Sequence, residues 1–274
     1  MARSESTFIA IGGGGTNDSI LRAFFDAIKD KSDASVVVMT VASNDTNGMT
    51  SAYNSMFRKH NVKHVSMIDI VGRQDALRAA ALKKIEDADA IYFTGGDQLN
   101  ITSLFGGSPL DKLLQDKVRD GVVIAGTSAG AAMMASTMIK NGDGDESPKV
   151  GGVETSSGLD LIENTVIDTH FAQRGRYGRL LTALAHHPHI LCIGLDEKTA
   201  IVAKGKKFKV VGEGSVTVMC GVWMSHVDLP YREKGEQISI FDIRAHILSE
   251  GCSYDMKTRM PKAPAKALKK AAGK

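Results

Sequence analysis

Short apolar segments alternate with longer segments of helical periodicity through the first half of the chain. The apolar segments are rich in Val, Ile and Phe, as buried strands are, and they cover residues 7–13, 34–43, 62–70, 90–96 and 121–126. Aliphatic residues at helical spacing predict helices over residues 17–30, 50–60, 73–88 and 109–120. Such strands, separated by helices, predict an α/β fold with a mostly parallel sheet flanked by helices on both faces.

The second half of the chain continues this pattern and then changes it. A polar, glycine-rich segment over residues 140–152 predicts a loop. A strand, a helix and a strand follow, over residues 165–171, 177–187 and 190–195. Extra short antiparallel strands are predicted toward the C-terminus, over residues 199–203, 208–214 and 215–219. We therefore expect one α/β domain over residues 1–260 and a basic, disordered tail over residues 261–274.

The charge balance argues against nucleic acid as a partner. The 274 residues carry a net charge of +3, but five lysines lie in the last 14 residues, and without them 29 basic residues face 31 acidic ones. A nearly neutral body gives no field for nucleic acid. No apolar run approaches the roughly 18 residues of a membrane span. Cys192, Cys220 and Cys252 show no metal-binding spacing, so we expect reduced thiols in a soluble, cytoplasmic protein without membrane contact.

One serine lies among very small residues, directly after a predicted strand. Residues Gly126 to Gly130 spell GTSAG, which matches G-x-S-x-G. Where a strand turns sharply into a helix, this pattern exposes the serine hydroxyl, and the glycines remove side chains that would clash. A tight, well-packed turn without chemistry would explain the same letters. Two other glycine-rich segments, 12–15 and 95–96, also end predicted strands, where α/β sheets bind ligands. We therefore favour Ser128 as a nucleophile.

A nucleophilic serine needs a base and an orienting carboxylate. His170 ends the strand-like VIDTH, whose alternation predicts that Asp168 and His170 share one face. A hydrogen-bonded structural histidine is the alternative. Glu197 follows the strand ILCIGLD and is predicted to emerge at the same sheet edge as Ser128 and His170. Glu146, in the loop after the serine, stays open as the acid, and Asp196 is a third possibility.

Several stretches, in chain order, resemble the cyanophycinase family of serine peptidases, which is related to aspartyl dipeptidase E. They are YFTGGDQLNITSL (92–104), GTSAGAAMM (126–134), GLDLIENTVIDTHFAQRGRYGRLLTAL (158–184) and IGLDEKTAIV (193–202). The resemblance implies hydrolysis of cyanophycin, a poly-aspartate with arginine on each β-carboxyl, to β-Asp-Arg dipeptides by a homodimer. It also implies a catalytic serine, histidine and glutamate, here Ser128, His170 and either Glu197 or Glu146.

Charged residues beside His170 fit this substrate. Arg174, Arg176 and Arg179 follow the histidine closely. A guanidinium can hold the free α-carboxylate of a β-linked arginine as a bidentate fork, although a charged helix face is the ordinary reading of three nearby arginines. The substrate's own guanidinium needs an acid, and Asp168 is the predicted partner.

Amide groups complete the predicted site. Gln98 offers a donor and an acceptor to a substrate amide, and the N–H groups of Gly96 and Ala129 form the predicted oxyanion hole. We expect neither a metal nor an organic cofactor. The chain departs from the family at Thr169, where glutamine is sometimes found, and at Asn100, where a basic residue is frequent. Both positions bear on substrate binding and leave the preference for polymer or dipeptide open.

Three other functions remain possible on the sequence alone. An aspartyl or isoaspartyl dipeptidase would cleave short Asp-X peptides and not the polymer. A nucleotide-binding module is suggested by residues 12–15, but Asn17 or Asp18 occupies the third glycine position of the dinucleotide fingerprint. A catalytically silent binding protein on the same scaffold would not react with a fluorophosphonate.

Overall fold

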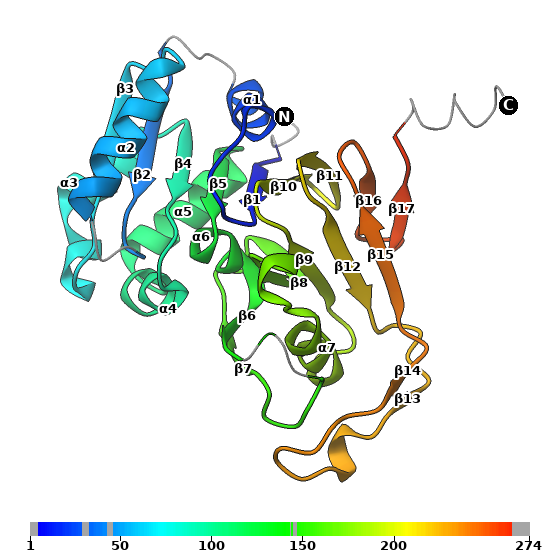
Figure 1. Cartoon of the computed structure of the whole chain (residues 1–274). Coiled ribbons are helices and arrows are strands. Elements are labelled where there is room, and N and C mark those ends of the chain that lie inside the picture. The colour runs from blue at the N-terminus through cyan, green and yellow to red at the C-terminus, as the bar shows by residue number, and fades with distance from the viewer. Residues whose placement is uncertain (1–4, 29–32, 43–45, 143, 145–146, 265–274) are drawn as a thin grey trace, which may run out of the picture.

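The computed structural model describes residues 5–28, 33–42, 46–142, 144 and 147–264. In this part of the chain, a nine-stranded sheet has the order β17-β16-β11-β10-β1-β5-β4-β2-β3 (Figure 1). The five strands from β1 to β3 in that order are parallel, and the other four pair antiparallel. The parallel strands are β1 (Thr7–Ile11), β5 (Val123–Thr127), β4 (Ala90–Phe93), β2 (Ser35–Met39) and β3 (His64–Ile68). The antiparallel strands are β10 (Thr199–Lys204), β11 (Lys207–Gly212), β16 (Ser253–Asp255) and β17 (Met260–Lys262).

Helices cover both faces of the parallel strands because the strand residues alternate between the two faces. Ile9 and Ile11 of β1 pack in one cluster with aromatic side chains of α1 and α2, whereas Ala10 packs in the cluster on the opposite face. The helices of the first face are α1 (Asp18–Ala27) and α2 (Thr46–Lys59). The second face is covered by η1 (Arg73–Leu77), α3 (Ala79–Glu86), α4 (Gln98–Asn100), η2 (Ile101–Phe105), α5 (Pro109–Arg119) and α6 (Ala129–Ala132). The predicted covering of both faces is confirmed.

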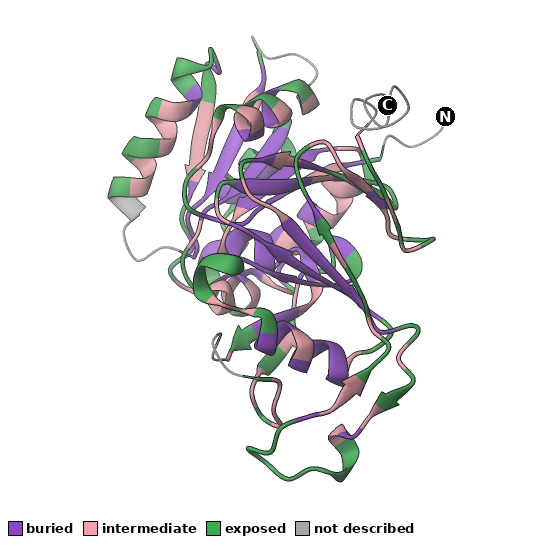
Figure 2. Cartoon of the chain, turned by 45° about the vertical axis from the view of Figure 1, so that its right-hand side comes forward, coloured by how far each residue is buried: buried purple, intermediate pink, exposed green. Residues whose placement is uncertain are grey.

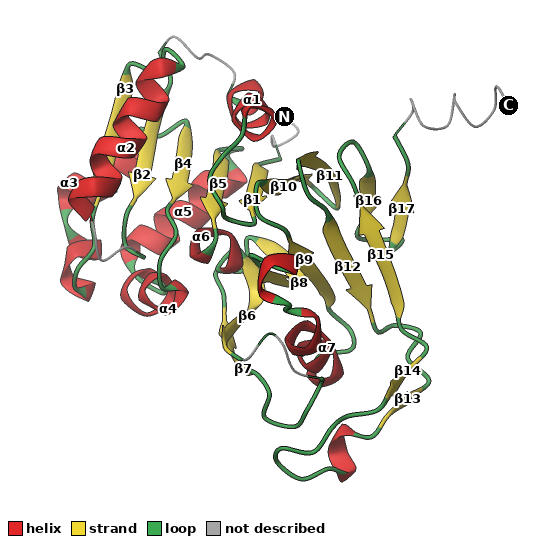
Figure 3. Ribbon diagram, viewed as in Figure 1, coloured by secondary structure: helices red, strands yellow, loops and turns green. Residues whose placement is uncertain are grey.

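A second sheet, of six strands among the described residues, has the order β15-β12-β9-β8-β6-β7. One of its faces shares the main core with the nine-stranded sheet, and the other is covered by α7 (Figure 3). The strands are β6 (Ala135–Asn141), β7 (Glu154–Ser157), β8 (Ile162–Asp168), β9 (Leu191–Leu195), β12 (Val216–Cys220) and β15 (Arg244–Leu248). The remaining elements are η3 (Ala172–Arg174), α7 (Tyr177–His186), η4 (Leu229–Tyr231) and the pair β13 (His226–Val227) and β14 (Ile240–Phe241). The buried strands lie in the interior, and the β13–β14 hairpin projects from the body (Figure 2).

The α/β class is confirmed, but the sheet is less parallel than predicted. The sequence predicts one mostly parallel sheet, whereas the structure divides the strands between two large mixed sheets. The predicted antiparallel strands toward the C-terminus are present as β10, β11 and β12. The predicted domain boundary after residue 260 falls inside β17, where Pro261 pairs with Tyr254. Residues 265–274 of the predicted tail lie outside the described residues.

Candidate active site

Ser128 lies at a sharp turn between a central strand and a short helix. Strand β5 ends at Thr127, α6 begins at Ala129, and Ser128 between them has φ +54° and ψ −113°. Its N–H donates to the carbonyl oxygen of Ile11 at 2.9 Å, so the turn is fixed to the neighbouring strand. A serine held in this strained conformation projects its side chain from the end of the sheet, as the G-x-S-x-G pattern predicts.

The glycines around the serine are needed because backbone segments pass very close. A Cβ atom on Gly126 would lie 2.2 Å from the carbonyl oxygen of Gly130, and one on Gly130 would lie 2.4 Å from that of Phe93. A Cβ on Gly95 would contact the Ser128 Cβ at 3.4 Å. The loop after β4 therefore lies directly against the serine, and Gly95, next to the predicted Gly96, makes that contact.

Ser128, His170 and Glu197 form a continuous chain of side-chain hydrogen bonds. The Ser128 Oγ is 2.9 Å from the His170 Nε2, and the His170 Nδ1 is 2.6 Å from the Glu197 Oε1. Since a carboxylate can only accept, the His170 Nδ1 donates to it, and Nε2 is left to accept the serine hydroxyl. The histidine side chain is 13% exposed and that of Glu197 34%, so solvent reaches one end of the chain. Glu146 lies outside the described residues.

The glycine-rich loop after β1 forms one wall of this site. The carbonyl oxygen of Gly12 accepts the His170 N–H at 2.7 Å. A Cβ on Gly13 would lie 2.3 Å from the His170 Cε1, and one on Gly14 would lie 2.6 Å from the Glu197 Cβ. The loop thus packs its backbone against both side chains. The sequence alone does not predict this role, although the position of the glycines at the end of a strand is a signal for it.

Gln173 and Asp196 hold the loops that carry the histidine and the glutamate. The Gln173 side-chain oxygen accepts the Glu197 N–H at 2.9 Å. Asp196 is 6% exposed and accepts from the N–H of Ala172 and from the Ser215 hydroxyl, at 3.1 and 2.8 Å. The Asp196 carboxylate therefore holds these loops together and is not the acid that contacts His170. Gln173 was not predicted, because a glutamine after a strand carries no signal of its own.

Asp168 and His170 do not share a strand face as predicted. Strand β8 ends at Asp168, and His170 has φ +48°, so the alternation stops before the histidine. Asp168 is 2% exposed and accepts from Arg179 at 2.5 and 2.7 Å and from Arg176 at 3.3 Å. The expectation that Asp168 binds a substrate guanidinium is therefore wrong in this structure, because its carboxylate already holds two arginines of the chain.

The three arginines differ in what they contact. Arg179 is 8% exposed, and its guanidinium donates to Asp168 and to the carbonyl oxygen of Gly142. It is therefore not free to bind a substrate carboxylate, contrary to the prediction. Arg176 donates to the carbonyl oxygen of Thr169 at 2.7 Å. Burial lowers the pKa of Arg176 to about 10, and the charges of Arg179 and Arg174 lower it as well. The negative charge of Asp168 opposes this shift. Arg174 is exposed.

Thr169 and Gln98 are less available than the sequence suggests. Thr169 is 5% exposed and donates its N–H to the Asp168 side chain at 2.9 Å. The Gln98 amide donates to the carbonyl oxygen of Ile139 at 2.9 Å, which leaves its side-chain oxygen as the remaining polar atom. Ala129 directly follows the serine in the chain, and the role of Gly96 and Ala129 as oxyanion donors stays a prediction.

Ser128 follows a strand of the nine-stranded sheet, whereas His170 and Glu197 follow strands of the six-stranded sheet. A serine, an imidazole and a carboxylate joined in this way by hydrogen bonds have the arrangement of a hydrolase that forms a covalent intermediate. The model of Peptidase family S51 matches residues 8–211, and the chain belongs to this family of serine-type peptidases.

Named proteins are similar to this chain over most of its length. The chain is 35% identical over 233 residues to the cyanophycinase of Geminocystis herdmanii (strain PCC 6308), covering 84% of this chain and 86% of that one. It is 33% identical over 242 residues to the cyanophycinase of Trichormus variabilis (strain ATCC 29413 / PCC 7937), covering 88% and 81%. The crystal structure of a peptidase from an acI-B1 Actinobacterium shares the fold, with a TM-score of 0.68, 19% identity, and coverage of 93% of this chain and 98% of that one.

Proposed function

We propose that this peptidase is a cyanophycinase, which hydrolyses cyanophycin (multi-L-arginyl-poly-L-aspartate) to β-Asp-Arg dipeptides. The observation that carries the proposal is the hydrogen-bonded chain of Ser128, His170 and Glu197, with distances of 2.9 and 2.6 Å. Cyanophycinases similar to this chain over more than four fifths of its length support the choice of substrate.

The reaction proceeds through an acyl-enzyme. His170 removes the Ser128 proton as Oγ attacks a main-chain carbonyl of the polymer next to a β-Asp-Arg unit. The N–H groups of Ala129 and Gly96 stabilise the oxyanion. His170 then protonates the leaving amine, and water, activated by the same imidazole, releases the acyl group. Glu197 holds the imidazole in the tautomer that can accept the serine proton and stabilises the charge that forms on it.

Substrate carboxylates bind on the side of the site that η3 and the start of α7 form. Arg174 lies in η3, four residues after His170, and is exposed. Arg176 is only partly buried. It shares the carboxylate of Asp168 with Arg179, so one negative charge faces two positive charges. Because Arg176 and Arg179 share Asp168, the exposed Arg174 is the arginine of this segment that is left to bind the free α-carboxylate of a β-linked arginine.

Turnover of the insoluble polymer tests the function. A suspension of purified cyanophycin should clear on incubation with the protein, with release of β-Asp-Arg, whereas the Ser128→Ala variant should leave it turbid and keep the melting temperature of the parent. Cleavage of short Asp-X peptides without clearing would favour an isoaspartyl dipeptidase. That alternative rests on the departures from the family at Thr169 and Asn100.

The proposal includes a homodimer, as the family resemblance implies, and a location in the cytoplasm. Cys192, Cys220 and Cys252 are free, which suits a reducing compartment. Among the described residues, no helix has the length and apolar character needed to cross a membrane. Light scattering should give twice the mass of 29.3 kDa, and a monomer at micromolar concentration would contradict the dimer.

A further inference from the structure

The hydrogen bond between Ser128 and His170 joins two different sheets. Ser128 follows β5 of the nine-stranded sheet, and its N–H is bonded to Ile11 of β1 in the same sheet. His170 follows β8 and Glu197 follows β9, and both strands belong to the six-stranded sheet. The 2.9 Å distance between the Ser128 Oγ and the His170 Nε2 therefore depends on how the two sheets are held relative to each other.

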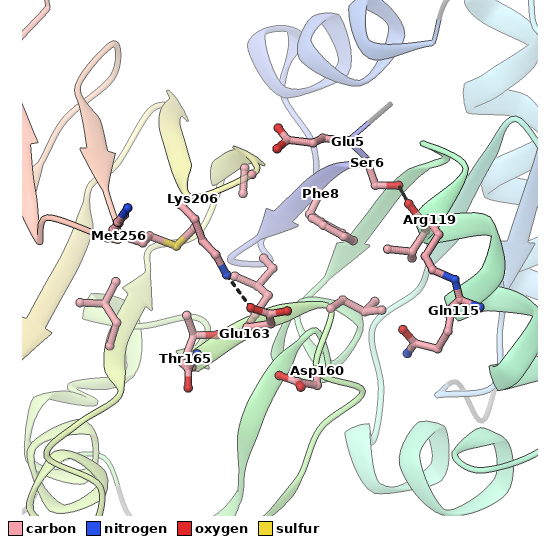
Figure 4. Close-up of a pocket in the computed structure, with 18 of the residues that line it drawn as sticks. Glu5, Ser6, Phe8, Gln115, Arg119, Asp160, Glu163, Thr165, Lys206 and Met256 are labelled. Atoms are coloured by element: carbon pink, nitrogen blue, oxygen red, sulfur yellow. Dashed lines mark hydrogen bonds and ion pairs between the residues drawn. The ribbon is translucent and has the colours of Figure 1, made fainter. Parts of the chain in front are cut away.

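At the opposite edge of the molecule, a cavity of 870 Å³ lies between the two sheets (Figure 4). Its lining includes Phe8 of β1 in one sheet and Ile162 of β8 in the other. Lys206 and Glu163 form an ion pair there, and their side chains are 57% and 58% exposed. An ion pair between exposed side chains contributes little to stability. This edge therefore gives the two sheets little support, and the bonds at the active-site edge matter more.

At the active-site edge, two short segments carry the chain between the sheets. Residues 196–198 connect β9 with β10, and residues 213–215 connect β11 with β12. The Asp196 side chain, in the first segment, accepts from the N–H and the hydroxyl of Ser215 in the second, at 3.0 and 2.8 Å. The Asp196 N–H donates to the Ser215 carbonyl oxygen at 3.2 Å. Asp196 thus ties the two segments to each other.

The same carboxylate also holds the loop that carries the histidine. Its other oxygen accepts the N–H of Ala172, two residues after His170, at 3.1 Å. Asp196 is 6% exposed, so water offers little replacement for these bonds. The three donors require an acceptor at both oxygens, which a carboxylate provides. An amide does not, because its NH2 group would face the Ala172 N–H in one orientation and the Ser215 N–H in the other.

We propose that Asp196 is a positioning residue for catalysis, which keeps the His170 Nε2 within hydrogen-bond distance of the Ser128 Oγ. It acts through the loop that carries the histidine. His170 has φ +48°, an uncommon conformation that persists only where the surrounding structure holds it. Loss of the bond to Ala172 or to Ser215 lets this loop move relative to the sheet that carries the serine. The inference rests on the proposed acyl-enzyme mechanism, but it does not depend on which substrate is cleaved.

The rate at which a fluorophosphonate labels Ser128 tests the proposal without the polymer. Asp196→Asn should lower the maximal labelling rate, kinact, about 10²-fold, because a displacement of about 1 Å in a catalytic geometry has an effect of that size. The inhibitor constant KI should stay unchanged, since the buried carboxylate does not contact the probe. Ser215→Ala removes one of the three bonds to the carboxylate and should lower kinact about tenfold or less.

Two control variants separate positioning from a loss of stability or of charge. Asp228 is 8% exposed and also accepts three hydrogen bonds, from Arg232 and from a backbone N–H, in the hairpin that projects from the body (Figure 2). Asp228→Asn should lower the melting temperature as Asp196→Asn does, but it should leave kinact unchanged. Glu163→Gln removes a negative charge near the start of β8, at the cavity in Figure 4, and should also leave kinact unchanged.

The crystal structure of the Asp196→Asn variant gives a second, independent measurement. The distance between the Ser128 Oγ and the His170 Nε2 should increase beyond about 3.5 Å, where a hydrogen bond is lost. The bond between His170 and Glu197 should remain, because the Glu197 N–H stays bonded to Gln173 of the histidine loop.

An unchanged distance, a parental kinact in Asp196→Asn, or an equal loss of kinact in Asp228→Asn would each overturn the proposal. If Asp196→Asn does not fold, an unchanged kinact in Ser215→Ala overturns it instead. A failure of the proposed function appears differently, as a parent protein that clears no cyanophycin or is not labelled at Ser128. The crystal structure of the variant would then still decide whether Asp196 sets the distance between the serine and the histidine.

Discussion

Each of the three residues proposed for catalysis lies just after the end of a strand. Ser128, His170 and Glu197 come after β5, β8 and β9, and all three strands end at one edge of the molecule. The roles of Asp168 and Arg179 were not predictable, because the sequence places them near His170 but does not show that they bind each other at 2.5 Å. Burial decides whether a charged residue faces a substrate or another side chain, and a single sequence gives no measure of it.

At the residue scale, the choice between the two glutamates can be tested directly. Glu197→Gln should lower kcat for cyanophycin roughly 10³- to 10⁴-fold, because the amide no longer selects the productive histidine tautomer. Glu146→Gln should keep most of the parental kcat. The measurement is initial rates of dipeptide release with both variants at saturating polymer. A large loss in Glu146→Gln with little change in Glu197→Gln would reverse the assignment.

The arginines near His170 should separate into binding and structural residues. Arg174→Gln should raise KM for cyanophycin several-fold at an unchanged melting temperature, because the side chain is exposed. Asp168→Asn should instead lower the free energy of unfolding by about 3–5 kcal/mol, because it leaves the buried Arg179 without its carboxylate. Denaturant unfolding and steady-state kinetics measure the two effects. An unchanged stability of Asp168→Asn would show that this ion pair is not structural.

At the scale of elements, the loop after β1 is the least predictable part of the site. Four consecutive glycines indicate that the backbone lies close to a neighbouring group, and a nucleotide was disfavoured because the dinucleotide fingerprint fails at Asn17 or Asp18. In the structure the neighbours are His170 and Glu197, because the loop lies between the ends of β5 and β10 and next to the histidine loop. The nature of the neighbour depends on strand order, which local sequence does not encode.

Two alanine substitutions in this loop should have different effects on activity. Gly13 and Gly15 have φ +98° and +87°, so alanine at either position costs about 1 kcal/mol or more in backbone strain. A Cβ at Gly13 meets the His170 ring at 2.3 Å, whereas one at Gly15 has no heavy atom of the described residues within 4 Å. Gly13→Ala should therefore lower kcat/KM strongly, and Gly15→Ala should not. Equal loss of kcat/KM in both variants, measured at matched stability, would contradict the proposal that the loop after β1 packs against His170.

At the scale of the whole molecule, the strands and helices of the α/β unit were predictable and their division between two sheets was not. The apolar segments before residue 130 correspond to β1 through β5, and those after residue 160 to β8 through β12. The assignment of β8 and β9 to a separate sheet depends on pairing between distant segments, such as β12 with β9 and β15. The sequence also does not predict short polar strands such as β7 and β17, because they have little apolar alternation.

The buried core of the second sheet predicts a pattern of thiol reactivity. Burial raises the pKa of Cys192 well above its usual value, and the side chain is fully covered. Cys252 is only partly covered. In the folded protein at neutral pH, iodoacetamide should therefore alkylate Cys252 first, and Cys192 should react only after unfolding. Peptide mass mapping over time measures this order, and equally fast alkylation of Cys192 would show that the second sheet opens readily.

The proposed mechanism requires that the hydroxyl group of Ser128 becomes the site of covalent attachment during turnover. Peptide mass mapping after reaction with a fluorophosphonate locates the peptide that carries the covalent adduct. A single adduct on the peptide that contains Ser128 is expected, formed rapidly by the parent protein and very slowly by the His170→Ala variant. An adduct on another residue, or none at all in a preparation that still clears cyanophycin, would contradict the claim.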